Sequence, residues 1–220
     1  MKTIRIDGPI GQGPGEYSAR WLRSQLPADG SPIEVKIHSE GGSVFEAFAM
    51  FDTIKGYSGR KTATVESMAF SAASLLLCAF DDVAITENGY TMVHAPYFDN
   101  EETPKSERQL LASLRERMIG IYSEKTRKPI ATISRMVDEE TFLDAESSVS
   151  LGIVNRVARA SSAVMARMPA RILARIKAAK PGASATARWN AAVSACGSVS
   201  KADKKHPGLR LEMLAEVNKR

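Results

Sequence analysis

The 220-residue sequence has little cysteine and no long apolar run. Its two cysteines are Cys78 and Cys196, and Cys78 lies in an apolar stretch typical of a protein core. We therefore expect no structural disulfide and a reducing, cytoplasmic location. No apolar segment approaches the roughly 20 residues that span a bilayer, so we expect no membrane association. Residues 1–7 alternate like a strand and lack the apolar block of a signal peptide.

Several sequence motifs that indicate a particular chemistry are also absent. There is no G-x-S-x-G element, so an α/β-hydrolase nucleophile elbow is not indicated. The glycine-rich residues 8–15 match neither a phosphate-binding P-loop nor a dinucleotide-binding fingerprint. No cysteine and histidine grouping has metal-ligand spacing. We expect neither a metal nor a cofactor.

The net charge of +5 is distributed unevenly along the chain. Residues 159–220 contain 13 Lys or Arg against 3 Asp or Glu, whereas residues 1–158 contain 17 against 22. We predict a folded domain over residues 1–157 and a basic tail rich in Ala, Ser, Lys and Arg over residues 158–220. The tail is expected to be partly helical, at 164–179 and 209–218, or disordered, and to be able to bind an acidic partner or nucleic acid weakly.

The first 157 residues alternate between strand-like and helix-like patterns. Strands are predicted at residues 3–6, 33–37, 62–65, 83–85, 91–93 and 153–157. Helices are predicted at residues 16–25, 44–54, 71–79, 104–125, 129–137 and 145–151. Such alternation predicts an α/β fold whose sheet is mainly parallel, with crossover helices.

Ser71 and His94 are the most informative pair of residues. Ser71 lies among small side chains just before an apolar helical run, in the sequence VESMAFSAASLLL (residues 65–77). His94 ends an apolar strand in the sequence YTMVHAP (residues 90–96). A hydroxyl and an imidazole in these positions form a nucleophile and base if the fold brings them together. Ser67 and Ser74 compete for the first role, and a serine before a helix is commonly only an N-cap.

Two further groups would complete such a site. Paired glycines at 41–42, after a predicted strand, and the Ala72 N–H at a helix start can offer backbone donors to an oxyanion. A carboxylate should orient the imidazole. The segment DEETFLDAE (residues 138–146) offers five carboxylates, and spacing alone does not choose among them.

Taken together, residues 1–157 resemble the ClpP-like serine peptidases. Residues 37–42 resemble the family's strand and oxyanion loop, usually ending Ser-Pro-Gly-Gly, with Glu40 in place of the proline. Residues 69–74 resemble the nucleophile segment, and residues 92–96 resemble Met-Ile-His-x-Pro. Residues 140–146, followed by 151–154, are similar to the segment that holds the family's aspartate. That position is Glu140 here, with Asp138 and Glu139 as substitutes.

The resemblance implies a ClpP/crotonase-like fold of repeated ββα units and a serine-type endopeptidase. It implies catalytic roles for Ser71, His94 and Glu140, and an oxyanion hole at the backbone N–H groups of Gly42 and Ala72. It also implies a ring-shaped homo-oligomer, heptameric or as stacked rings, in which the helix at 104–125 joins the rings. Within the family, the chain most resembles the head maturation proteases of tailed bacteriophages and prophages. The implied substrates are capsid and scaffold polypeptides, cleaved in the host cytoplasm or inside the procapsid.

Three alternatives stay open. The first is a general ClpP-type peptidase working with an ATP-dependent unfoldase. The second is a crotonase-superfamily acyl-CoA enzyme, whose chemistry needs no serine–histidine couple. The third is a non-enzymatic capsid-assembly or scaffold-binding protein that binds through its basic tail.

Overall fold

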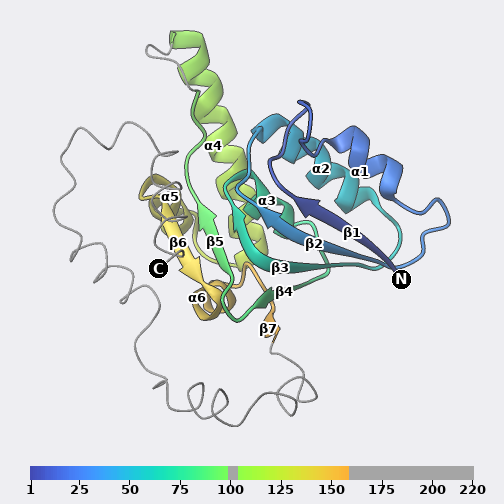
Figure 1. Ribbon diagram of the computed structural model, residues 1–220. Helices are drawn as coiled ribbons and strands as arrows, with labels where there is room; N and C mark the ends of the chain where they lie inside the picture. Colours follow the sequence, from blue (N-terminus) through green and yellow to red (C-terminus); the bar gives the residue numbers. More distant parts are fainter. Residues whose placement is uncertain (99–103, 159–220) are drawn as a thin grey trace, which may run out of the picture. The chain divides into compact units, whose positions relative to one another are not determined.

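The computed structural model of the protein describes residues 1–98 and 104–158 (Figure 1). Apart from Ala158, the predicted tail, with its two candidate helices and Cys196, lies outside the described residues. The strands are β1 Lys2–Asp7, β2 Ile33–Ser39, β3 Lys61–Phe70, β4 Asp82–Thr86, β5 Tyr90–Val93, β6 Thr141–Asp144 and β7 Arg156–Ala158. The helices are α1 Ala19–Gln25, α2 Val44–Gly56, α3 Ala72–Leu77, α4 Lys105–Thr126, α5 Ile130–Asp138 and α6 Ala145–Leu151.

The strands form one sheet in which the long strand β3 has two neighbours on the same side. The order β1-β2-β3-β4-β7 is parallel throughout, and residues 62–65 of β3 pair with β4. Beyond that point Met68–Phe70 pair instead with β5, again in parallel. The short strand β6 then adds antiparallel to β5. The predicted α/β fold with a mainly parallel sheet is therefore confirmed.

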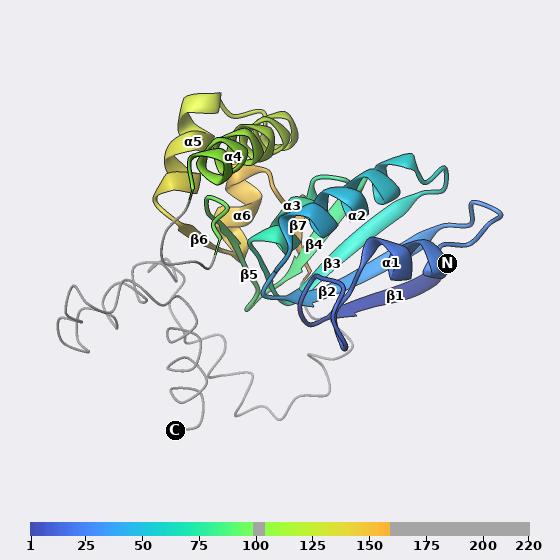
Figure 2. The ribbon, with the colours of Figure 1, turned by 90° about the horizontal axis from the view of Figure 1, so that it is seen from above.

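The core is formed where the helices cover the sheet. Strand β2 alternates buried and half-buried residues, and Ile33, Val35 and Ile37 are fully buried. Figure 2 shows α1 and α2 over β1 to β3, and α4 and α5 side by side near β6.

Cys78 is a free, buried core residue, as predicted, and burial raises the pKa of its thiol to about 12. No helix within residues 1–98 and 104–158 is long and apolar enough to cross a membrane.

Most predicted elements are present, and the differences lie around the site. Strand β3 extends five residues past the predicted end, so the following helix begins at Ala72. Strand β6 was not predicted, because its four residues lie in an acidic segment without a clear period. The predicted strand at 153–157 is only Arg156–Ala158. The first predicted helix is shortened to Ala19–Gln25, where the Ser18 side chain caps it.

Candidate active site

Ser71 occupies the sharp connection between β3 and α3. Its backbone lies at φ 52° and ψ −124°, in a region that non-glycine residues rarely adopt. Its N–H donates to the carbonyl of Met92 at 2.9 Å, which ties the connection to β5. The Ser71 side chain makes no capping hydrogen bond to α3. The simple N-cap interpretation is therefore wrong, and the hydroxyl is free to point elsewhere.

The Ser71 hydroxyl points to His94. The distance between Ser71 Oγ and His94 Nε2 is 2.6 Å, a short hydrogen bond. Strand register explains why these two side chains are close. Phe70 pairs with Met92 in parallel strands, so the chain leaves β3 and β5 at the same end of the sheet. The two residues are 23 positions apart in sequence. The structure thus brings together the two side chains that the sequence analysis singled out, whose catalytic roles stay a prediction.

The two competing serines lie in different environments. Ser67 is exposed on β3, four residues before Ser71. Ser74 is fully buried, and its hydroxyl bonds to the Ser71 carbonyl at 2.7 Å and to the Tyr122 hydroxyl at 2.8 Å. Burial and these two bonds make Ser74 a structural residue. Of the three serines, Ser71 is the one bonded to a histidine.

The imidazole of His94 is half-buried between protein groups. Burial lowers its pKa below the ordinary value, while the charge of Glu140 and the backbone of Ala95 act in the opposite direction. The ring of Tyr97 lies 5.6 Å from the imidazole, between ring centroids, and is 58% exposed. The imidazole is therefore kept neutral near pH 7, the form that accepts a proton.

Strand β6 decides which of the five carboxylates lies near His94. Val93 pairs with Thr141, so the next position in the antiparallel register places His94 opposite Glu140. Glu140 itself has φ 50°, an unusual conformation for a non-glycine residue. Sequence spacing did not choose among the carboxylates, because β6 was not predicted; only the resemblance pointed to Glu140, with Asp138 and Glu139 as substitutes.

The other four carboxylates have other surroundings. Asp138 forms a two-point ion pair with Arg115 of α4, with contacts of 2.8 and 2.6 Å. Asp144 caps α6 by accepting from the N–H of Ser147 at 2.8 Å. Glu139 and Glu146 are exposed, as Glu140 also is, so exposure does not distinguish among these three. Glu140 is the carboxylate whose charge acts on the His94 imidazole.

Gly41 lies directly against the nucleophile segment, and Gly42 lies against Ile10. Ser39 pairs with Ala69 after a bulge, which brings the end of β2 to the end of β3. A Cβ on Gly41 would lie 2.6 Å from the Phe70 carbonyl oxygen and 2.9 Å from both the Ala72 nitrogen and the Ser71 Cβ. A Cβ on Gly42 would lie 2.2 Å from the Ile10 oxygen. Both have positive φ, 99° and 137°, so this close approach requires glycine twice.

Sequence reasoning missed two residues that shape this loop. The buried Ser39 hydroxyl accepts a hydrogen bond from the Gly41 N–H at 3.1 Å. Ile10, from the glycine-rich loop, accepts from the N–H of Ser43 at 2.8 Å and donates to the Gly41 carbonyl at 2.7 Å. That loop therefore supports the glycine pair.

Among residues 1–98 and 104–158, no group of three His, Cys, Asp or Glu side chains is arranged to hold a metal ion.

Comparison with known proteins bears on the family of the chain. The Clp protease family matches residues 19–161. The ATP-dependent Clp protease proteolytic subunit 1 of Protochlamydia amoebophila is 31% identical over 140 residues, covering 60% of this chain and 68% of that protein. The subunit of the same name from Chlamydia caviae is 28% identical over 141 residues, covering 60% and 73%. Sequence, fold and relatives agree, and the chain belongs to the Clp protease family of peptidases.

Proposed function

We propose that this chain is a serine endopeptidase whose nucleophile is Ser71 and whose general base is His94. The observation that carries the proposal is the 2.6 Å hydrogen bond between Ser71 Oγ and His94 Nε2. A serine hydroxyl is a weak nucleophile until an adjacent base removes its proton. Here the base is held neutral by burial, and the hydroxyl is held by a strained backbone at the end of a strand.

The reaction follows from these groups. His94 takes the Ser71 proton as the oxygen attacks a peptide carbonyl, and the imidazolium then gives that proton to the leaving amine. The acyl-enzyme is hydrolysed by water, with His94 again acting as the base. Glu140 stabilises the imidazolium and selects its tautomer.

Backbone N–H groups of Gly42 and Ala72 would hold the oxyanion of the tetrahedral intermediate. The Gly41 N–H is already donated to Ser39, so Gly42 is the glycine of the pair that serves this role. Ala72 is the first residue of α3, where N–H groups have no acceptor within the helix. Ala72 directly follows Ser71, and Gly42 directly follows Gly41, whose added Cβ would lie 2.9 Å from the Ser71 Cβ.

The natural substrates in this proposal are capsid and scaffold polypeptides during phage head maturation. The support is the resemblance described above together with the basic extension, whose 13 basic and 3 acidic residues would attract acidic polypeptides. Cleavage takes place in the bacterial host cytoplasm or inside the procapsid. The enzyme assembles as a ring-shaped homo-oligomer, a heptamer or stacked rings, with α4 at the contact between rings.

A second candidate is favoured by the names of the curated relatives. These are proteolytic subunits of ATP-dependent Clp proteases, so the chain would be a general peptidase that receives substrates from an ATP-dependent unfoldase. Co-purification with such an unfoldase, and ATP-dependent cleavage of a folded substrate, would favour this candidate over head maturation.

The deciding experiment is co-expression of the chain with a capsid and scaffold protein. Mass spectrometry of the products should show cleavage by the wild-type chain, and intact polypeptides with Ser71→Ala. Unchanged processing by Ser71→Ala would reject the nucleophile. Assembly without cleavage by either chain would instead favour a non-enzymatic capsid-assembly protein.

A further inference from the structure

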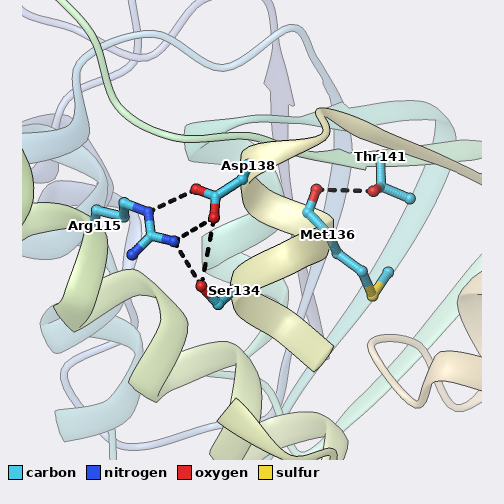
Figure 3. A network of polar contacts seen from close by, with 5 residues as sticks. All are labelled: Arg115, Ser134, Met136, Asp138 and Thr141. Atoms are coloured by element: carbon cyan, nitrogen blue, oxygen red, sulfur yellow. Dashed lines mark hydrogen bonds and ion pairs between the residues drawn. The ribbon is translucent and has the colours of Figure 1, made fainter. Parts of the chain in front are cut away.

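The acidic turn after α5 is held by an ion pair with α4. Residues 138–140 are three consecutive carboxylates, which repel one another. Arg115 of α4 binds both oxygens of Asp138, through Nε at 2.8 Å and a terminal guanidinium nitrogen at 2.6 Å (Figure 3). The same nitrogen donates to the Ser134 hydroxyl at 2.6 Å, one helical turn earlier on α5. Planar, two-point contact of this kind fixes orientation as well as distance.

The turn is also fixed on the side that faces His94. The Ala95 N–H donates to the Val137 carbonyl at 3.0 Å, joining the residue after His94 to the end of α5. The Thr141 hydroxyl donates to the Met136 carbonyl at 2.8 Å, which holds the start of β6 (Figure 3). Glu140 lies between these two anchors with its left-handed backbone. Such a conformation persists only where its surroundings determine it.

We propose that Arg115 is a positioning residue for the active site, acting through Asp138 to hold the turn that presents Glu140 to His94. This inference rests on the proposed function, because it assigns Glu140 as the carboxylate that orients the imidazole. Arg115 itself touches neither Ser71 nor His94. Its contacts are with α5, and α5 leads directly into Glu140.

The charge of Arg115 also contributes to the positioning of Glu140. The guanidinium of Arg115 lowers the pKa of Asp138, so Asp138 stays ionised and paired. Without Arg115, the Asp138 carboxylate would be released beside Glu139 and Glu140, where it would repel Glu140 away from the position it holds near the imidazole. The groups that face the imidazole are the Ser71 hydroxyl, the Glu140 carboxylate, the Ala95 backbone and the Tyr97 ring.

A purely structural role would give a different result. The side chains of the pair are 29% and 51% exposed, and exposed ion pairs contribute little to stability. Loss of the pair should therefore leave the folded chain largely intact. An effect on the ionisation of His94 would be out of proportion to any effect on the melting temperature.

The test uses Arg115→Met in the full chain, with Arg117→Met as the matched control. Arg117 lies two residues further along α4, over the ring of Phe48 at 5.4 Å, and not on Asp138. NMR titration of the His94 ring, identified by its loss in His94→Gln, reports the imidazole pKa whether or not the chain is active. Peptide cleavage reports kcat/KM, and thermal unfolding reports stability.

We expect Arg115→Met to lower kcat/KM about tenfold and to lower the pKa of His94, because the charge of Glu140 is no longer held near the ring. Arg117→Met should change neither. The charge-swapped double variant Arg115→Asp with Asp138→Arg should recover most of the loss, which would identify the ion pair itself as its origin.

Two results would overturn the positioning role. One is an unchanged His94 pKa in Arg115→Met when Glu140→Gln shifts it. The other is an equal effect of Arg115→Met and Arg117→Met. Failure of the proposed function has a separate signature: undiminished cleavage by Ser71→Ala, whatever the His94 titration shows.

Discussion

The hydroxyl of Ser74 donates a hydrogen bond to the backbone carbonyl of Ser71, at 2.7 Å. Because the Ser74 proton is used in this bond, the contact of 2.8 Å between Ser74 and Tyr122 requires the tyrosine to donate. Helix α3 thereby holds the candidate nucleophile by its own backbone, while leaving the Ser71 side chain to His94. A buried hydroxyl pair from α4 and α3 thus supports the strained residue 71.

The hydrogen bonds from Tyr122 to Ser74 and from Ser74 to the Ser71 carbonyl predict that removing the two hydroxyls has unequal effects on stability. Tyr122→Phe removes one donor and leaves the Ser74–Ser71 bond intact, so we expect a loss of about 1 kcal/mol. Ser74→Ala leaves both the Ser71 carbonyl and the buried Tyr122 hydroxyl without this partner, and we expect a loss of about 2 to 3 kcal/mol. Chemical denaturation of both variants measures the difference. Equal losses would show that the Ser74–Ser71 bond contributes nothing.

Ser71→Ala should abolish labelling by a serine-directed fluorophosphonate and lower the cleavage rate by about 10⁴-fold or more. The reason is that the hydroxyl bonded to His94 is lost while the fold is retained. Ser67→Ala is the matched control, because Ser67 lies exposed on the same strand and should leave labelling unchanged. Peptide mapping of the labelled chain identifies the modified serine, and modification at residue 67 would transfer the assignment.

Glu140→Gln should slow cleavage more than Asp138→Asn does. The glutamine keeps the shape of the side chain but no longer stabilises the imidazolium, so we expect a loss of about 10²-fold or more in kcat/KM. Asp138 acts only through Arg115 and the turn, so its loss should be smaller. Steady-state kinetics of the two variants at one pH decides the order, and the reverse order would move the third role to Asp138.

The pH dependence of kcat/KM should follow the ionisation of His94. Burial lowers the pKa of His94 below its ordinary value, so the neutral base predominates at pH 7 and activity falls only on acidification below about 6.5. Glu140 raises that pKa, so Glu140→Gln should move the acidic limb to still lower pH while its plateau falls. An acidic limb that moved to higher pH in Glu140→Gln would contradict the arrangement.

Gly41→Ala should inactivate the protein by displacing Ser71. Its Cβ would lie 2.6 Å from the Phe70 carbonyl oxygen, and its φ of 99° is also unfavourable for alanine. Gly15→Ala is a suitable control, because Gly15 also has a positive φ, 81°, but has no atom within 4 Å of the added Cβ. Both variants place an alanine at a positive φ and so have similar backbone strain. A difference in fluorophosphonate labelling between them therefore reports the steric effect at Gly41. Equal labelling of the two would show that Gly41 is not essential to the site.

Local sequence was sufficient for most helices and strands, and for the segments that carry the site. Apolar periodicity predicted α2, proline marked the starts of α4 and α5, and Gly152 marked the end of α6. These signals act within a few residues, so they can be recognised before the chain is folded. The candidate nucleophile and histidine were recognised for the same reason, since each lies at the end of its own local pattern.

Tertiary structure alone decided which of the competing side chains meet. Ser67 and Ser74 competed with the favoured Ser71, and spacing alone did not choose among five carboxylates; the pairing of β3, β5 and β6 determines which of these side chains lie together. Strand β6 is four residues long and has no detectable period by itself, yet its register places Glu140 opposite His94. Strand pairing joins residues distant in sequence, and shifting a register by one residue turns every side chain to the other face. Local pattern therefore supplied the candidates, and the long-range pairing of strands selected among them.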